Sequence, residues 1–163
     1  MDKQHRYAAT IEWTGNTGPG TTSYRAYERR HDIVVDGKPV IPGSSDFSFR
    51  GDRSRYNPED LLIASLPACH MLWYLGLCAN AGVVVVSYLD RAQGVMVEGA
   101  DGGGRFTRVV LHPEVTLAAG SNLERAEALH QEAHAKCFIA NSVNFPVEHE
   151  PIMRAETVRA ALA

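Results

Sequence analysis

The chain has 163 residues, of which 45% are hydrophobic and 21% charged, and its formal net charge is −3 at pH 7. These values are typical of one globular domain with a real core and exclude a disordered segment. The negative charge and the absence of a basic block argue against nucleic-acid binding. Three cysteines are too few for a disulfide scaffold, and the first twenty residues do not resemble a targeting peptide, so we expect a cytoplasmic protein.

The first third of the chain is predicted to be a strand region, residues 1–56. Residues 7–13 read as a strand, and residues 14–22 as a loop rich in glycine and threonine. Residues 31–35 end in Asp36-Gly37, a strong hairpin turn signal. Residues 39–43 contain two prolines and are expected to break structure, and residues 44–56 form a charged, serine-rich loop.

A long central helix is predicted over about residues 58–80. Asn57 is a good N-cap, Pro58 suits the first helical position, and Glu59 and Asp60 favour the first turn. The helix is expected to end near Asn80.

Residues 61–79 of this helix contain no charged side chain, so length alone would allow a membrane span. Pro67, His70 and Asn80 argue against a membrane, as does the lack of flanking lysine and arginine. A helix that is apolar all round must be covered on every side. We therefore expect a central helix in a homodimer.

The second half alternates between strands and a second helix. A sheet is predicted over residues 83–117, with Pro113 marking an edge or a bulge. Ser121 and Glu124 form a capping box for a helix over residues 121–137. A terminal strand near residues 145–150 and a weakly helical tail at 154–163 make up region 143–163. Segregated runs of this kind predict a single α+β domain, residues 1–163, with antiparallel sheets.

Three cysteines differ in their surroundings. Cys78 lies in an apolar run without a charged neighbour and is interpreted as structural. Cys69 lies ten residues after Glu59, and Pro67 removes a helix hydrogen bond just before it. A reactive thiol needs a nearby cation to hold its thiolate, and arginines precede the helix. Cys137 closes the second helix.

The Asn57-Pro58-Glu59 turn, followed by a cysteine ten residues after the glutamate, resembles the central helix of the OsmC/Ohr family. That family comprises osmotically inducible protein C and the organic hydroperoxide resistance proteins. Cys137 matches a second family cysteine near the end of the second helix, within the stretch from Glu132 to Val143. The resemblance covers the whole chain and implies an intertwined homodimer with an OsmC-like α+β fold.

The resemblance also implies a thiol peroxidase that reduces organic hydroperoxides and, as a further substrate, hydrogen peroxide. Cys69 would attack the peroxide and become a sulfenic acid, and Cys137 would resolve it to a disulfide. Glu59 would hold an arginine that stabilises the thiolate. Arg50 and Arg25 both match family arginines, and Arg50 is favoured. An external dithiol would reopen the disulfide, and no cofactor is expected.

Two other interpretations remain open from the sequence. Cys69, His70, His134 and Cys137 offer a zinc ligand set, although adjacent residues such as Cys69 and His70 point about 100° apart on a helix. A redox-inactive protein that binds small hydrophobic ligands would need neither thiol. Four apolar residues could line its pocket, although at helical spacing they are more often core: Met71, Trp73, Phe138 and Phe145.

Overall fold

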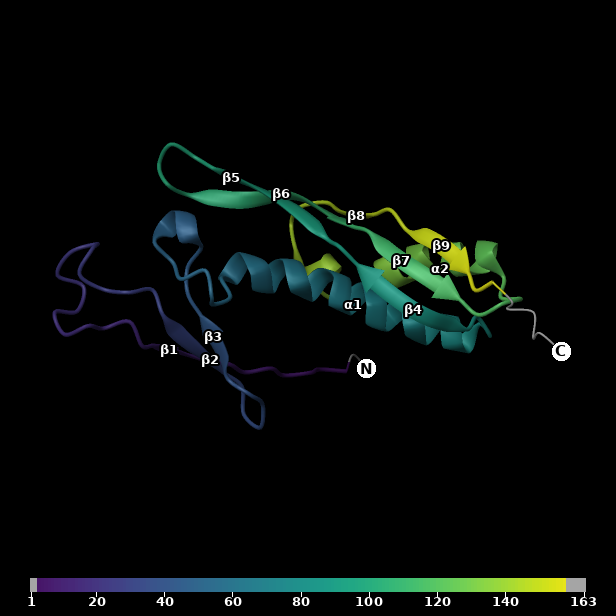
Figure 1. Ribbon diagram of the computed structural model, residues 1–163, viewed down its shortest axis with the longest axis horizontal. Coiled ribbons are helices and arrows are strands. Elements are labelled where there is room, and N and C mark those ends of the chain that lie inside the picture. The colour runs from purple at the N-terminus through teal and green to yellow at the C-terminus, as the bar shows by residue number, and fades with distance from the viewer. Residues whose placement is uncertain (1–2, 158–163) are drawn as a thin grey trace. The chain divides into compact units, whose positions relative to one another are not determined.

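The computed structural model describes residues 3–157 (Figure 1). The chain divides into two compact units, Met1–Leu62 and Ile63–Ala163, each with its own strands. Mixed helices and sheets confirm the predicted α+β class. The predicted tail lies partly in a strand, at Arg154 and Ala155, and residues 158–163 lie outside the described residues.

The first unit contains a three-stranded antiparallel sheet in the order β1-β2-β3. Its strands are β1 (Thr10–Trp13), β2 (His31–Val34) and β3 (Ile41–Gly43). Gly37 adopts a φ of 71° in the β2–β3 turn, as the Asp-Gly signal predicts. The prediction that residues 39–43 break structure was wrong for residues 41–43, which form β3. As an edge strand, β3 tolerates Pro42.

A short 3₁₀ helix, η1 (Phe47–Phe49), follows the sheet. The Asp46 carboxylate caps it by accepting a bond from the Ser48 N–H at 2.7 Å. Arg50 ends η1 in the left-handed conformation, with a φ of 66°. Such a φ is uncommon for a residue other than glycine, and it often marks a functional segment.

We expect Gly51→Ala to destabilise the protein by about 2 kcal/mol, because the new methyl group would overlap a backbone atom. A Cβ on Gly51 falls well inside the contact distance of the Ser45 carbonyl oxygen. The matched control is Gly103→Ala, whose Cβ meets the Asp101 carboxylate at an ordinary 3.4 Å. Urea unfolding measures both changes, and equal midpoints for the two variants would contradict the expectation.

Helix α1 (Pro58–Asn80) begins where the sequence predicts. The Asn57 side chain accepts a bond from the Asp60 N–H at 2.7 Å, and the Asp60 carboxylate accepts one from the Asn57 N–H at 3.3 Å. Within residues 3–157, α1 is the one helix long and apolar enough to cross a membrane by length and composition. That is weak evidence, because the core helix of a soluble protein passes the same test.

The second unit holds two three-stranded sheets, in the orders β4-β7-β9 and β5-β6-β8. The strands are β4 (Val85–Asp90), β5 (Gln93–Glu98), β6 (Gly104–Leu111), β7 (Pro113–Leu117), β8 (Val147–His149) and β9 (Ile152–Ala155). The predicted sheet over residues 83–117 is thus divided between two sheets, with β6 and β7 in different ones. The chain changes sheet at Pro113, which has no N–H to continue the ladder. The pairs β6–β8 and β7–β9 are parallel, so the sheets are mixed rather than purely antiparallel.

Helix α2 (Leu123–Lys136) begins two residues later than predicted. Asn122 is its N-cap, accepting the Arg125 N–H at 2.9 Å, whereas the Ser121 N–H donates to the Ala118 carbonyl in the preceding turn. The capping box of Ser121 and Glu124 was therefore wrong. A second 3₁₀ turn, η2 (Ala140–Ser142), follows α2.

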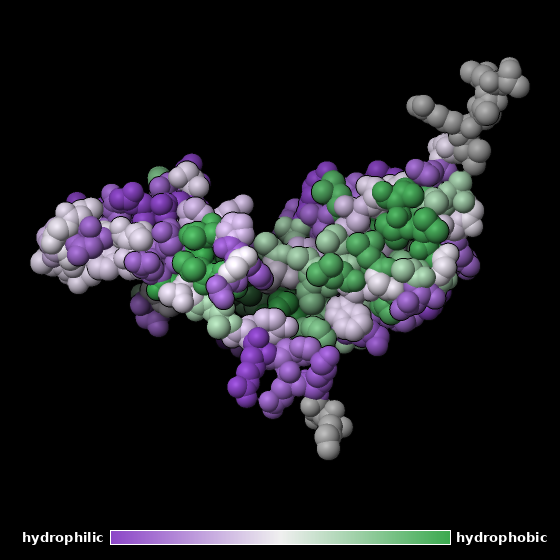
Figure 2. All heavy atoms as spheres, turned by 90° about the horizontal axis from the view of Figure 1, so that it is seen from below, coloured by the Kyte–Doolittle hydropathy of each residue, from purple (hydrophilic) through white to green (hydrophobic). Residues whose placement is uncertain are grey.

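The core of the second unit has two clusters along α1. One joins α1 to β7 and α2, through Tyr74, Cys78, Leu117 and Leu129 among others. The other joins Leu66 of α1 to β6. Apolar side chains also lie at the protein surface (Figure 2), and Leu72 of α1 is 68% exposed. The chain's own residues therefore leave part of α1 uncovered.

Candidate functional site

Two of the three cysteines lie together in the second unit. Cys69 lies on α1 and is half-buried, whereas Cys137 follows α2 directly and is buried. The Cys69 thiol lies close enough to Cys137 to raise the pKa of the Cys137 thiol. All three thiols are free in this structure, so the contact joins two reduced cysteines.

Burial and, after it, the neighbouring Cys69 raise the pKa of the Cys137 thiol to about 11. Backbone groups oppose this effect, because the Ala140 N–H donates to Cys137 Sγ at 3.4 Å. Cys137 is consequently a protonated thiol at neutral pH. That state suits a thiol that acts second, after its partner has been oxidised.

Cys78 has a different environment on the same helix. It is 1% exposed and lies with Tyr74, one turn earlier, in the same core cluster. Burial raises the pKa of this thiol too. With no contact to another cysteine among the described residues, Cys78 is part of the core.

Glu59 and the two candidate arginines belong to the first unit. One carboxylate oxygen of Glu59 is buried and has no hydrogen-bond partner within residues 3–157. No hydrogen bond or ion pair joins Glu59 to Arg50 or Arg25 in the same range. An unpaired buried carboxylate oxygen is costly, so this side of Glu59 is a place where a cation would be stabilised.

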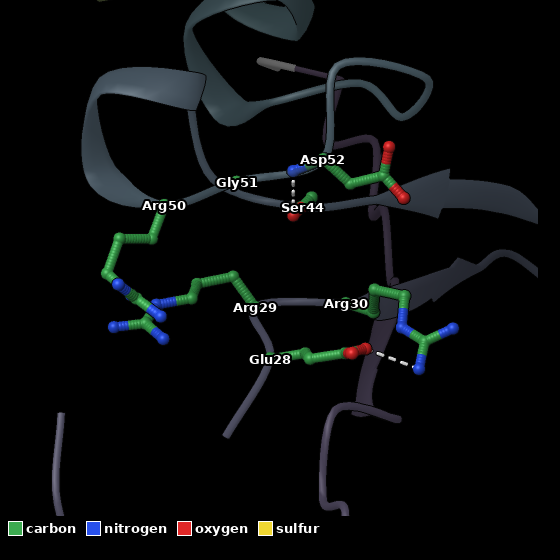
Figure 3. A pocket seen from close by; sticks show the side chains of 7 residues that line it. All are labelled: Glu28, Arg29, Arg30, Ser44, Arg50, Gly51 and Asp52. Atoms are coloured by element: carbon green, nitrogen blue, oxygen red, sulfur yellow. Dashed lines mark hydrogen bonds and ion pairs between the residues drawn. The ribbon is translucent and has the colours of Figure 1, made fainter. Parts of the chain in front are cut away.

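Arg50 lines a cavity of about 270 Å³ within the first unit, whereas Arg25 is an exposed loop residue (Figure 3). Arg29 lines this cavity too. Arg29 is already engaged, donating to the Tyr27 and Tyr24 carbonyls at 2.7 and 2.8 Å. Arg30 is paired with Glu28. Arg50 is the cavity arginine with no such partner in the described part of the chain.

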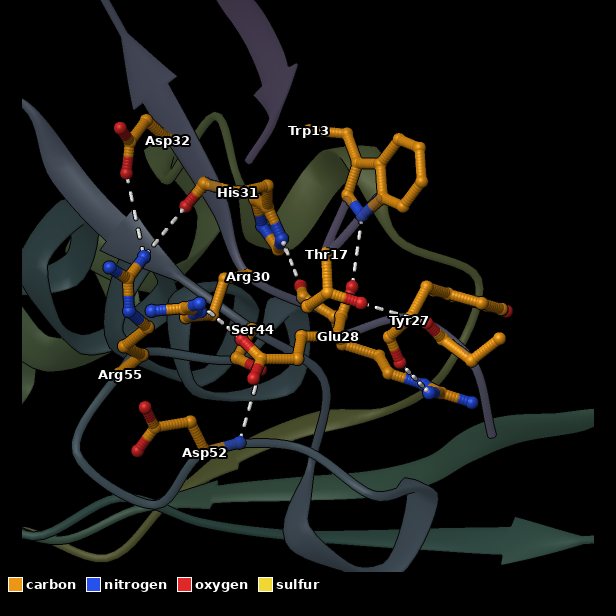
Figure 4. A network of polar contacts seen from close by, with 12 residues as sticks. Trp13, Thr17, Tyr27, Glu28, Arg30, His31, Asp32, Ser44, Asp52 and Arg55 are labelled. Carbon is orange, nitrogen blue, oxygen red and sulfur yellow. Dashed lines mark hydrogen bonds and ion pairs between the residues drawn. The ribbon is translucent and has the colours of Figure 1, made fainter. Parts of the chain in front are cut away.

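A polar network fixes the walls of this cavity (Figure 4). Ser44 is 1% exposed, and its hydroxyl accepts the Asp52 N–H at 3.1 Å. The Trp13 indole donates to the Glu28 carbonyl at 2.9 Å, which ties the loop before β2 to β1. Arg55 forms an ion pair with Asp32 at 3.5 Å, so its charge is already paired within the first unit. The cavity is therefore held by bonds that leave Arg50 free to take a ligand.

Two aromatic residues lie close to the thiols in sequence and in space. Trp73, one turn after Cys69, packs edge-on against Phe138, with ring centroids 5.6 Å apart. Phe138 directly follows Cys137 and is 68% exposed. Phe145, by contrast, packs against Phe106 in the core. Of the four apolar residues considered for a ligand pocket, Trp73 and Phe138 therefore form an apolar surface near the thiols.

Sequence reasoning missed a buried pair of histidines in the second unit. His70 is 1% exposed and His130 is 0% exposed, and His70 Nε2 lies 2.9 Å from His130 Nδ1. The two residues are far apart in the chain, and no local pattern reports such a contact. His134 and His149 lie next to this pair, with ring centroids 5.3 Å apart.

The zinc interpretation gains no support from the geometry. Within residues 3–157, no group of three or more histidine, cysteine or acidic side chains is arranged to hold a metal ion. Cys69 and Cys137 are together, but His70 turns to His130 instead of joining them. The donor set that the sequence offers is thus divided between two different contacts.

Known proteins of the same fold are found by sequence and by structure. Residues 51–151 match the family model of OsmC-like proteins. An OsmC-like protein of unknown function from Vibrio cholerae O1 biovar eltor is 32% identical, with a TM-score of 0.83 over 91% of this chain and 100% of that chain. An organic hydroperoxide resistance protein from Elizabethkingia anophelis, 19% identical, has a TM-score of 0.69 over 96% and 100% of the two chains.

A third structure, an organic hydroperoxide resistance protein from Legionella pneumophila, is 18% identical, with a TM-score of 0.66 over 94% of this chain and 99% of that chain. No curated protein matches the chain. The two hydroperoxide resistance proteins show a shared fold, and the family model together with the Vibrio relative shows the family. The chain belongs to the OsmC-like protein family.

Proposed function

We propose that this protein is a cysteine-based peroxidase that reduces organic hydroperoxides. The observation that carries the proposal is the contact between the Cys69 and Cys137 thiols in the second unit. Two structural neighbours are named organic hydroperoxide resistance proteins, which supports a role in peroxide stress. The exposed aromatic surface of Trp73 and Phe138 suits an apolar substrate.

In the proposed reaction, the Cys69 thiolate attacks the outer peroxide oxygen, the O–O bond breaks, and the alkoxide takes a proton and leaves as an alcohol. Cys69 is then a sulfenic acid. The Cys137 sulfur attacks the Cys69 sulfur, the hydroxyl leaves with the Cys137 proton as water, and a disulfide remains. An external dithiol reduces that disulfide through thiol exchange. One peroxide is thereby reduced for each dithiol oxidised.

A second copy of the chain is part of the proposal. The surface of α1 that the chain leaves uncovered is apolar, and burial of such a surface favours association. We propose a homodimer in which the partner covers this helix.

The first experiment is to map the cysteines after oxidation. Reduced protein is mixed with a slight excess of cumene hydroperoxide, quenched under denaturing conditions, alkylated and analysed by peptide mass. We expect a Cys69–Cys137 disulfide with Cys78 alkylated. Cumyl alcohol, which has the same shape without the peroxide bond, is the control and should leave all three thiols alkylated.

If all three thiols were alkylated after peroxide treatment, no cysteine would have been oxidised, and the proposal would be refuted. Measurements of zinc content and of bound hydrophobic ligand would then test the two remaining interpretations of the sequence. A disulfide that involves Cys78 would also contradict the assignment, because Cys78 is a buried core residue to which the proposed reaction gives no role.

We expect Arg50→Ala to lower kcat/KM for cumene hydroperoxide by about 100-fold, because a cation that stabilises developing charge contributes on that order. Arg50 lines the cavity and has no ion-pair partner among residues 3–157, whereas Arg25 is an exposed loop residue. Arg25→Ala is therefore the matched control, and its kcat/KM should stay within about threefold of the unmodified protein. If Arg25→Ala lowered kcat/KM more than Arg50→Ala does, the charge-stabilising role would belong to Arg25.

A further inference from the structure

Four histidines form one cluster in the second unit, outside the thiol contact. His70 comes from α1, His130 and His134 from α2, and His149 from β8. The His149 ring centroid lies 5.4 Å from that of His70 and 6.1 Å from that of His130. The proposed peroxidase chemistry uses none of these side chains, so the cluster requires an explanation of its own.

The innermost pair, His70 and His130, is joined by a hydrogen bond between α1 and α2. The Nε2···Nδ1 distance is 2.9 Å, and the Tyr74 ring stacks on His130 with centroids 3.8 Å apart. Burial lowers the pKa of both imidazoles, so both are neutral at pH 7. In a neutral pair one ring donates and the other accepts, which makes the bond directional.

This bond is costly to break in place. The outer nitrogens, His70 Nδ1 and His130 Nε2, already have no hydrogen-bond partner within the described residues. If the helices shifted, the inner nitrogens would become unpaired as well, and a buried unpaired polar group destabilises the folded protein. The pair therefore favours one particular arrangement of α1 against α2.

The same two helices carry the two thiols. His70 directly follows Cys69 on α1. His130 precedes Cys137 by two turns of α2, so both point from the same side of that helix. A rotation or slide of α1 along α2 would consequently change the His70–His130 bond and the Cys69–Cys137 contact together.

We propose that the His70–His130 hydrogen bond is a positioning contact that holds Cys69 within reach of Cys137 for disulfide closure. The proposal rests on the proposed peroxidase function. The equilibrium between two thiols and their disulfide depends on the effective concentration of one sulfur at the other. A contact that keeps the helices in register raises this concentration without touching either sulfur.

The test measures the equilibrium of the Cys69–Cys137 disulfide against a glutathione redox buffer at pH 7, in the full-length protein. His70→Leu removes the hydrogen bond, whereas His70→Gln places an amide near the former Nε2 and retains it. We expect His70→Leu to lower the equilibrium constant for disulfide formation about tenfold, which is about 30 mV. His70→Gln should restore it to within about threefold of the unmodified protein.

The comparison is repeated from the other helix with His130→Leu and His130→Asn, since the asparagine amide lies near the former Nδ1. If His70→Leu does not fold, the His130 variants give the same measurement. His112→Gln is the matched control, because His112 lies in the same unit but pairs with Glu150 outside the cluster. Near-ultraviolet circular dichroism checks that each variant is folded.

Equal equilibrium constants for the leucine and amide variants would overturn the positioning role and leave the peroxidase proposal intact. If the leucine and the amide variant lowered the equilibrium constant equally at both positions, the positioning role would also be overturned, because the amide retains the hydrogen bond. If the unmodified protein forms no Cys69–Cys137 disulfide at any buffer ratio, both proposals fall together.

Discussion

Cys69→Ser is expected to reduce peroxidase turnover at least about a thousandfold, because a serine hydroxyl cannot replace a thiolate as the nucleophile. Turnover is measured as loss of cumene hydroperoxide with dithiothreitol as the reductant. Cys78→Ala is the matched control on the same helix, since Cys78 contacts Tyr74 in the core and no other thiol among residues 3–157. Its turnover should remain within about threefold of the unmodified protein, at some cost in stability.

Cys137→Ser completes this experiment. The variant should consume about one equivalent of peroxide and stop, with a sulfenic acid on Cys69 that reacts with dimedone. Normal multiple turnover in Cys137→Ser would remove Cys137 from the mechanism while leaving Cys69 as the nucleophile. Equal activity of Cys69→Ser and the unmodified protein would refute the peroxidase proposal altogether.

The second large effect is a loss of folding stability in mild acid. Burial, together with the charges of His149 and His134, lowers the pKa of His70 from its ordinary value of 6.5 to about 4. Burial, together with the charges of His70 and His149, lowers the pKa of His130 to about 3. The unfolded chain therefore binds protons between about pH 6.5 and 4 that the folded protein does not bind.

The sign of the effect follows from this difference. Stability is fully present above pH 6.5 and falls as the pH decreases towards 4, because protonation favours the unfolded chain. For His70 alone, the difference between 6.5 and about 4 corresponds to about 3 kcal/mol. Carboxylates such as Asp46 and Asp52 have lowered pKa values, so their contribution is lost only at lower pH.

Urea unfolding of the reduced protein, followed by circular dichroism between pH 7.5 and 4.5, measures this loss. The double variant His70→Gln and His130→Asn cannot titrate at these positions, so its stability should depend much less on pH in that range. His112→Gln should keep the full dependence, because His112 lies outside the buried pair. A flat curve for the unmodified protein would show that the pair binds protons in the folded state as readily as in the unfolded chain, and would contradict its burial in solution.

Local sequence signals predicted the helices well and the sheet connections poorly. Asn57 and Pro58 fix the start of α1 through side-chain capping and a preset backbone angle, and both effects are local. The division of residues 104–117 between two sheets depends on which strands lie beside each half, and those are β8 and β9, far along the chain. Pro113 signalled an irregularity but not a change of sheet.

The candidate site shows the same limit. The pairing of Cys69 with Cys137 was implied by a family resemblance and stays a prediction, although the two thiols lie close together. The roles of Glu59, Arg50 and Arg25 stay predictions, because no bond joins them in the described chain. The His70–His130 bond could not be predicted, since a histidine on an apolar helix face has no signature that identifies a distant partner.

The parallel pairing of β8 with β6 and of β9 with β7 sets the order in which the second unit can be completed during synthesis. Strands β6 and β7 leave the ribosome well before their C-terminal partners, and until then each presents an unpaired edge. Exposed edges of this kind recruit other strands, so the nascent chain passes through a period of susceptibility to aggregation. The strands made last, β8 and β9, are short, but they are the ones that cover these edges of β6 and β7.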